Sequence, residues 1–180
     1  MNIELKSFKH FASLSEETEA FSAMVYVDGK RAFIAENTGK GESHRLTPVK
    51  GQTYDIIRKV SEWAITQPQV DIWDGELLND SLDFYLSRLV DEFVLKKELK
   101  RLLNKSVVIF KLKTEGGDLI QLASKFRPTM LSEFRTNLRD VYPECVILND
   151  LPFDEAMGYY KNTSSPDKLE VFYRQWKAKN

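Results

Sequence analysis

Residues 37–48 read NTGKGESHRLTP and combine residue types that bind anions: two glycines, a lysine, a serine, a histidine and an arginine. Basic and hydroxyl side chains beside glycines can surround a phosphate, because glycine lets backbone N–H groups come close. A P-loop would need G-x-x-x-x-G-K-S/T between a strand and a helix, and a dinucleotide-binding loop would need a third glycine. We therefore predict an irregular, solvated loop with glycines at positive φ. Its candidate ligand-binding residues, for an anion, are Lys40, Ser43, His44 and Arg45.

Patterns of catalytic or metal-binding residues are not recognisable in the sequence. The chain has one cysteine and two histidines, and neither C-x-x-C nor H-x-x-x-H spacing occurs. Cys145 opens an apolar segment, which favours a buried small side chain over a nucleophile. Carboxylates from Asp71 to Asp83 are better explained by solvation and helix capping than by Mg²⁺. We predict no metal, no cofactor and no catalytic residue, which argues against an enzyme; a small hydrolase built from dispersed residues stays open.

Charge is distributed unevenly along the chain, although the formal net charge is −1. Residues 62–95 are mostly acidic, whereas residues 96–139 carry many more bases than acids. An acidic surface could dock on a basic partner protein or imitate nucleic acid, and the basic half could bind a nucleotide or nucleic acid. Aromatic residues near the C-terminus are candidate anchors, since they are enriched at binding hot spots. The predicted partner-binding residues are Asp71, Asp74, Glu76, Tyr159, Tyr160 and Trp176.

The elements that must position these residues begin with strands. Alternating apolar residues predict strands over 2–8, 20–27 and 30–37, with a short helical turn or ordered loop over 12–20. Asp28-Gly29 between the second and third strands predicts a hairpin, because a type I′ turn needs positive φ at both central residues. The loop 37–48 would then leave the last of these strands.

Helices and a second hairpin follow. Helical spacing predicts helices over 53–65 and 79–105, the second capped by Asp80 or Ser81 and open to a break near 94–97. Its predicted apolar side comprises Leu82, Leu86, Leu89, Phe93, Leu99, Leu102 and Leu103. Further along, we predict strands over 106–115 and 119–126, a helix over 129–143, a strand over 145–150 and short helices over 152–161 and 167–179.

This order of elements predicts an α+β fold: an N-terminal antiparallel hairpin or meander, central helices, and a C-terminal hairpin with helices. A length of 180 residues fits a single domain, 1–180, with a β-rich region over 1–50, a helical region over 51–105 and a mixed region over 106–180. A single cysteine, and the lack of a signal-peptide or membrane-spanning apolar run, predict a soluble cytoplasmic protein without membrane contact. A homo-oligomer stays open.

Two strings of the sequence resemble a known family. SLSEETEAFSAMVYVDGKRA (13–32), which leads into NTGKG (37–41), resembles the start of a family of small uncharacterised proteins carried by phages and other mobile elements. VYPECVILNDLPFDEAMGYY (141–160) resembles their end. In those proteins the loop tends to read Asn-x-Gly-x-Gly-Gly, whereas Glu42 replaces the final glycine here. The resemblance implies an accessory protein that acts inside a bacterial host cell by binding, and most often by inhibiting, a host defence protein.

Overall fold

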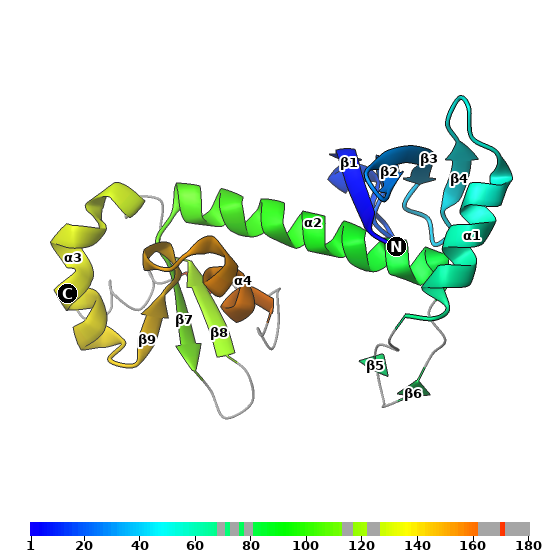
Figure 1. The fold of residues 1–180 in the computed structure, drawn as a ribbon. Helices are drawn as coiled ribbons and strands as arrows, with labels where there is room; N and C mark the ends of the chain where they lie inside the picture. Colours follow the sequence, from blue (N-terminus) through cyan, green and yellow to red (C-terminus); the bar gives the residue numbers. More distant parts are fainter. Residues whose placement is uncertain are drawn as a thin grey trace. The chain divides into compact units, whose positions relative to one another are not determined.

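The computed structural model describes residues 1–67, 71–72, 76–77, 81–112, 117–121, 127–161 and 170–171. Its internal contacts divide the chain into two compact units, Met1–Val94 and Leu95–Asn180. The chain combines β-sheets, antiparallel in the first unit, with helices and is an α+β protein, as predicted (Figure 1). The single domain over 1–180 stays a prediction.

The first unit is built on a four-stranded antiparallel sheet in the order β1-β2-β3-β4. Its strands are β1 (Ile3–His10), β2 (Phe21–Val27), β3 (Lys30–Asn37) and β4 (Arg45–Pro48), with a 3-10 turn, η1 (Ala12–Leu14), between the first two. The predicted β2–β3 turn is confirmed, because Asp28 and Gly29 have φ values of 48° and 78°. The loop 37–44, which carries Lys40, Ser43 and His44, connects β3 to β4, and Arg45 is the first residue of β4.

Two helices cover one face of this sheet. Helix α1 (Tyr54–Ala64) begins at Thr53, whose side chain accepts a hydrogen bond from the N–H of Asp55. Helix α2 (Leu82–Lys105) begins after Ser81, whose hydroxyl accepts from the N–H of Phe84 and caps the helix; Asp80, the other predicted cap, lies outside the described residues. A short hairpin of β5 (Asp71–Ile72) and β6 (Glu76–Leu77) lies between the two helices in the sequence. The buried core formed with the sheet contains Phe21, Val25, Phe33, Val60, Ala64, Leu82, Leu86 and Val90.

Helix α2 contributes residues to both units. Leu82, Leu86 and Val90 belong to the core of the first unit, and Leu99 and Leu102 belong to a core of the second. Nine residues separate Val90 from Leu99, about two and a half turns. The predicted apolar side of the helix is largely confirmed: four of its residues are buried, Leu89 and Leu103 are partly buried, and Phe93 is exposed. The helix runs without the break near 94–97 that the sequence left open.

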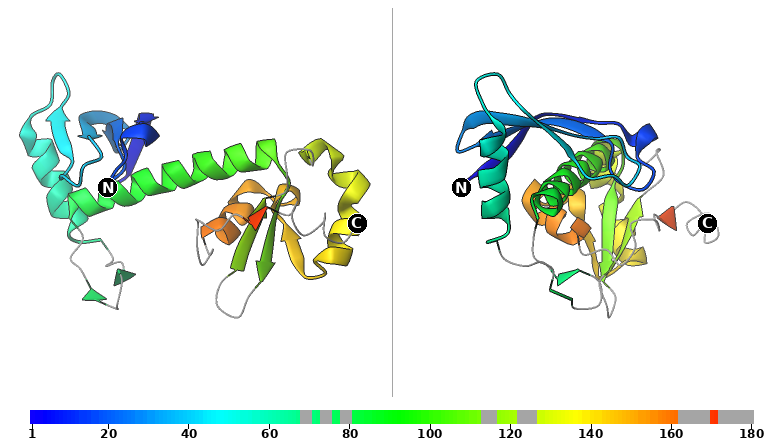
Figure 2. Two further views of the ribbon diagram at one scale, coloured as in Figure 1. Left: turned by 180° about the vertical axis from the view of Figure 1, so that it is seen from behind. Right: turned by 90° about the vertical axis from the view of Figure 1, so that its right-hand side faces the viewer.

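The second unit packs helices on both faces of a sheet with the order β10-β8-β7-β9. The strands are β7 (Val108–Leu112), β8 (Gly117–Gln121), β9 (Cys145–Ile147) and β10 (Glu170–Val171). Ile109 packs with α3 (Leu131–Val141), and Phe110 packs with the end of α2 and with α4 (Phe153–Lys161). Two 3-10 turns precede α3 and α4, η2 (Pro128–Met130) and η3 (Leu148–Asp150). Figure 2 gives two further views of these elements.

One element of the second unit differs from the sequence prediction. The sequence pattern predicts a helix over 167–179, but Glu170 and Val171, the residues described there, form strand β10. These two residues pair in parallel with Ile120 and Gln121 of β8. Pairing with a sheet edge outside the segment overrides its local helical pattern, which a sequence pattern cannot register.

No helix in the described residues of the chain is long and apolar enough to cross a membrane.

Candidate functional site

Asn37, the last residue of β3, organises the region around the loop 37–44. It is a buried polar residue, and its side-chain oxygen accepts hydrogen bonds from the Thr18 hydroxyl (2.9 Å) and the Gly39 N–H (2.7 Å). Its amide nitrogen donates to the Glu42 carbonyl (2.8 Å) and to Nδ1 of His44 (3.0 Å). All four hydrogen-bonding positions of the side chain are therefore used, and the side chain is fixed in one orientation.

A second contact joins the loop 37–44 to the segment 15–20; we call these two segments the paired loops. The carbonyl oxygen of Gly39 accepts from the N–H groups of Glu16 (2.9 Å), Glu17 (3.0 Å) and Thr18 (3.4 Å). Gly39 has φ +92°, and a Cβ atom at this position would overlap the carbonyl group of Leu14. The predicted positive φ at Gly39 is confirmed, and the close approach of the backbones explains why glycine is needed.

His44 is held in one tautomer by its neighbours. Gly39 N–H donates to the oxygen of Asn37, so the amide of Asn37 presents its NH₂ group to His44. Nδ1 of His44 must then accept, and Nε2 carries the proton and donates to Ser87 Oγ at 3.0 Å. Burial lowers the pKa of His44 and outweighs the opposing attraction of Asp83 and Glu42. His44 is therefore a neutral donor.

This tautomer decides what the Ser87–His44–Asn37 arrangement can do. A catalytic serine needs a histidine nitrogen that accepts its proton. In this tautomer Nε2 of His44 carries a proton and donates a hydrogen bond to Ser87 Oγ. His44 therefore cannot accept the proton of Ser87 as a base. The distances resemble those of a catalytic triad, but the hydrogen bonds run in the opposite direction, from the histidine to the serine.

His10 makes a second polar contact near the paired loops. Its Nε2 lies 2.6 Å from Glu19 Oε2, and 3.5 Å from Ser15 Oγ. Because a carboxylate accepts, Nε2 donates to Glu19 and is not free to accept a proton from Ser15. In a triad the acid and the nucleophile use different nitrogens of the ring. Here both contacts use the same one, so this cluster also lacks the geometry of a catalytic triad.

A pocket of about 410 Å³ opens between the segment 15–20 and α2. We call it the acid-lined pocket, because four carboxylate side chains line it: Glu16, Glu17, Glu19 and Asp91. The remaining lining residues are Ser15, Thr18, Phe21, His44, Ser87 and Val90. Among the residues that the structure describes, no Lys or Arg belongs to this lining, so the pocket favours a positively charged occupant.

Asp91 is the least favourably placed of these acids. Desolvation by neighbouring groups raises the pKa of its carboxyl, and the negative charge of Glu19 adds to this rise. Within the described residues, no hydrogen bond or ion pair to the Asp91 side chain is found. No group of carboxylate, histidine and cysteine side chains in these described ranges is arranged to hold a metal ion. The charge near Asp91 is thus left without a compensating cation.

The structure separates the four predicted ligand-binding residues. His44 lies in the acid-lined pocket, whereas Ser43 and Arg45 line a different pocket of about 480 Å³. Lys40 is exposed and lines neither of these two pockets. Ser43 and His44 precede β4 and Arg45 begins it, so residues adjacent in the sequence are divided between two pockets.

The predicted partner-binding residues are also dispersed. Tyr160 is buried in the second unit and donates to Glu98 at 3.0 Å, and Tyr159 packs against Phe110 with ring centroids 5.2 Å apart. Asp71 and Glu76 belong to strands β5 and β6. Asp74 and Trp176 lie outside the described residues. A role of these six residues in binding stays a prediction.

Cys145 is only partly buried, whereas the sequence favoured a buried side chain. Burial raises the pKa of the half-buried Cys145 thiol, which makes it a poor nucleophile.

The unit Met1–Val94 has ten Lys and Arg against sixteen Asp and Glu, a formal net charge of −6. The unit Leu95–Asn180 has sixteen bases against eleven acids, a net charge of +5. The acid-lined pocket therefore lies in the negatively charged unit.

Glu19, Asn37 and Asp91 were not singled out from the sequence as candidate site residues. Asn37 ends a strand and Asp91 lies within a helical pattern, so neither has a local signal of its own. The segments SLSEET and NTGKG, which were singled out in the sequence for another reason, contact each other in the paired loops.

Comparison of the chain with protein-family models, curated proteins and solved structures found no match.

Proposed function

We propose that the protein acts by binding, and that the acid-lined pocket receives a lysine or arginine side chain of a partner protein. The observation that carries this proposal is the uncompensated carboxylate of Asp91 beside Glu19. A cation between these two groups would relieve their repulsion, and the relief would contribute directly to the binding free energy.

The surroundings of the pocket support a protein partner with a basic surface. The net charge of −6 on the first unit attracts positively charged surfaces over long range and repels nucleic acid. Ser15, Thr18 and Ser87 add hydroxyl groups to the lining, which can accept hydrogen bonds from an ammonium or guanidinium group. A nucleotide would have to place its phosphates among four carboxylates, which disfavours this pocket as a nucleotide site.

The partner class rests on the resemblance of 13–32 and 141–160 to phage and mobile-element accessory proteins. Under this proposal the protein binds a bacterial host protein in the cytoplasm, and the expected consequence is inhibition of a host defence. The tautomer of His44 supports binding over catalysis, since it disfavours the hydrolase alternative at Ser87.

The proposal is tested by capture from a nuclease-treated bacterial lysate. Tagged wild-type protein and a Glu19→Gln/Asp91→Asn variant would be compared by quantitative mass spectrometry of the bound proteins. We expect one host protein in stoichiometric amount on the wild type, and at least a tenfold loss on the variant. Asp91→Asn alone should reduce capture as well, without disturbing the contact between Glu19 and His10.

A matched control removes one negative charge elsewhere in the same unit. Glu62 lies on α1, is exposed, and pairs with Arg58, so Glu62→Gln should leave capture unchanged. Equal capture by wild type and pocket variants would contradict the proposal. Recovery of nucleotide or nucleic acid without a protein partner would contradict it too.

A further inference from the structure

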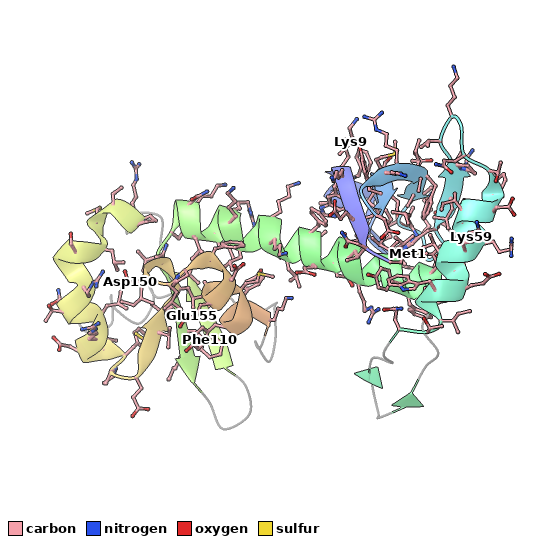
Figure 3. The ribbon with its side chains drawn as sticks, viewed as in Figure 1. Met1, Lys9, Lys59, Phe110, Asp150 and Glu155 are labelled. Atoms are coloured by element: carbon pink, nitrogen blue, oxygen red, sulfur yellow. The ribbon has the colours of Figure 1, made fainter. Side chains whose placement is uncertain are left out.

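One face of the β1-β2-β3-β4 sheet packs on the buried core, and the opposite face carries a row of polar residues that crosses all four strands. Lys9 of β1 pairs with Ser22 of β2, Ser22 with Glu36 of β3, and Glu36 with Arg45 of β4. Phe21 is buried in the core, so its neighbour Ser22 and the rest of the row face away from the core. Lys9 is labelled in Figure 3 near the end of β1. Lys9 and Arg45 thus stand at the two ends of this row, with the carboxylate of Glu36 between them.

The row forms part of the pocket of about 480 Å³ that also contains Ser43 and Arg45; we call it the outer pocket. Phe11 and Leu14 line it as well and are 42% and 55% exposed, so they add apolar surface to the pocket. Within the described residues, neither Lys9 nor Arg45 forms an ion pair or hydrogen bond through its side chain. The outer pocket therefore combines apolar surface with two cations, Lys9 and Arg45, and with two carboxylates, Glu36 and Glu42. Its volume suits a small organic ligand.

The loop at one wall of the outer pocket already holds an anion, its own Glu42. One carboxylate oxygen of Glu42 accepts from the N–H (2.9 Å) and the hydroxyl of Thr38. The other accepts from the N–H of Lys40 at 3.2 Å. These donors lower the pKa of Glu42 to about 2, with the Thr38 hydroxyl as the first cause. Donors that converge in this way form an anion-binding concavity.

We propose that the outer pocket binds a small organic phosphate, and that Glu42 is an internal ligand which this phosphate displaces. Glu42 is solvent-exposed, so its carboxylate can leave the loop without opening the core. The phosphate oxygens would then accept from Thr38 and Lys40, while Lys9 and Arg45 balance the added charge. An apolar or aromatic body on the phosphate would cover Phe11 and Leu14.

A phosphate fits this arrangement better than a carboxylate does. It offers three terminal oxygens and close to two negative charges, whereas the loop donors alone already satisfy a single carboxylate. This site differs from the acid-lined pocket in charge, lining and ligand. If the outer pocket does not bind a phosphate, the proposed binding of a basic partner at the acid-lined pocket is unaffected.

The test is a calorimetric titration of the full chain with AMP, and with inorganic phosphate as the probe without an apolar body. We expect AMP to bind Glu42→Ala at least tenfold more tightly than wild type, because the internal competitor is removed. Arg45→Gln should weaken AMP binding at least tenfold. Inorganic phosphate should bind more weakly than AMP to every variant.

The matched control is again Glu62→Gln, which makes the same change of charge outside the pocket. If it tightened AMP binding as much as Glu42→Ala, the gain would reflect general charge and the proposal would be overturned. Absence of AMP binding to both the wild type and Glu42→Ala would also overturn it. Circular dichroism of each variant establishes that the fold is retained.

Discussion

At the scale of single residues, Gly39 is the position where the two paired loops depend on a missing side chain. Gly39→Ala meets two obstacles, a φ of +92° and overlap of the new Cβ with the Leu14 carbonyl group. We expect a loss of roughly 3 kcal/mol in the free energy of unfolding, the sum of backbone strain and overpacking. Urea denaturation measures this loss.

Gly51 supplies the matched control for this prediction. It has φ +88°, but a Cβ there would meet nothing within 4 Å. Gly51→Ala should therefore cost only the backbone strain, about 1 kcal/mol. Equal losses for the two substitutions would show that the contact between the paired loops does not depend on the close approach at Gly39.

His44 gives a prediction about protonation. Because burial lowers its pKa, the unfolded chain takes up a proton between the ordinary pKa and the folded pKa, while the folded chain does not. The stabilising contribution of neutral His44 is therefore complete above the ordinary pKa of histidine and decreases as the pH falls toward the folded value. Long-range ¹H–¹⁵N spectra should show a protonated Nε2, an unprotonated Nδ1 and a depressed midpoint relative to the chain in urea.

The opposite tautomer would change the chemistry of the site. A proton on Nδ1 would leave Nε2 free to accept from Ser87, and the hydrolase alternative would regain its base. That spectrum would contradict both the fixed orientation of Asn37 and the argument against catalysis.

At the scale of elements, α2 should respond differently to substitutions in its two halves. Leu86 is fully buried in the core of the first unit, and Leu99 is fully buried in a core of the second. Replacing either by Ala should cost about 3 kcal/mol, the usual loss for a buried leucine. Hydrogen exchange should show that Leu86→Ala weakens protection in β2 and β3, and that Leu99→Ala weakens it in β7.

Equal loss of protection in both units for both variants would mean that the chain unfolds as one cooperative domain. That result would favour the single domain over 1–180 predicted from the sequence length. Separate losses would favour two units that unfold independently.

The elements themselves were largely predictable from local sequence, and the site was not. Asp28-Gly29 and the helical spacing in 53–65 are local signals, and each led to the element observed. The strand at Glu170–Val171 depends on pairing with β8, which lies about fifty residues earlier and leaves no local pattern. The acid-lined pocket likewise has no local sequence pattern, because Glu19 and Asp91 come from distant segments of the chain.

At the scale of the whole molecule, the near-neutral net charge conceals two units of opposite charge. The values of −6 and +5 mean that a basic partner meets attraction at the first unit, and that this attraction is screened by salt. Sequence counts alone showed two charge blocks, but the boundary between the units, at Val94 and Leu95, assigns each block to one of them. The central claim is that the acidic unit binds through Asp91 and its neighbours.

The most direct measurement is the pKa of the Asp91 carboxyl, followed by ¹³C NMR in the free protein and in the complex with the captured partner. In the free protein it should lie above its ordinary value, because of desolvation and the charge of Glu19. A lysine or arginine side chain in the pocket should move it below that value, since a nearby cation favours the ionised form. A pKa that does not change on binding would contradict the account, because the partner's basic group would then lie elsewhere.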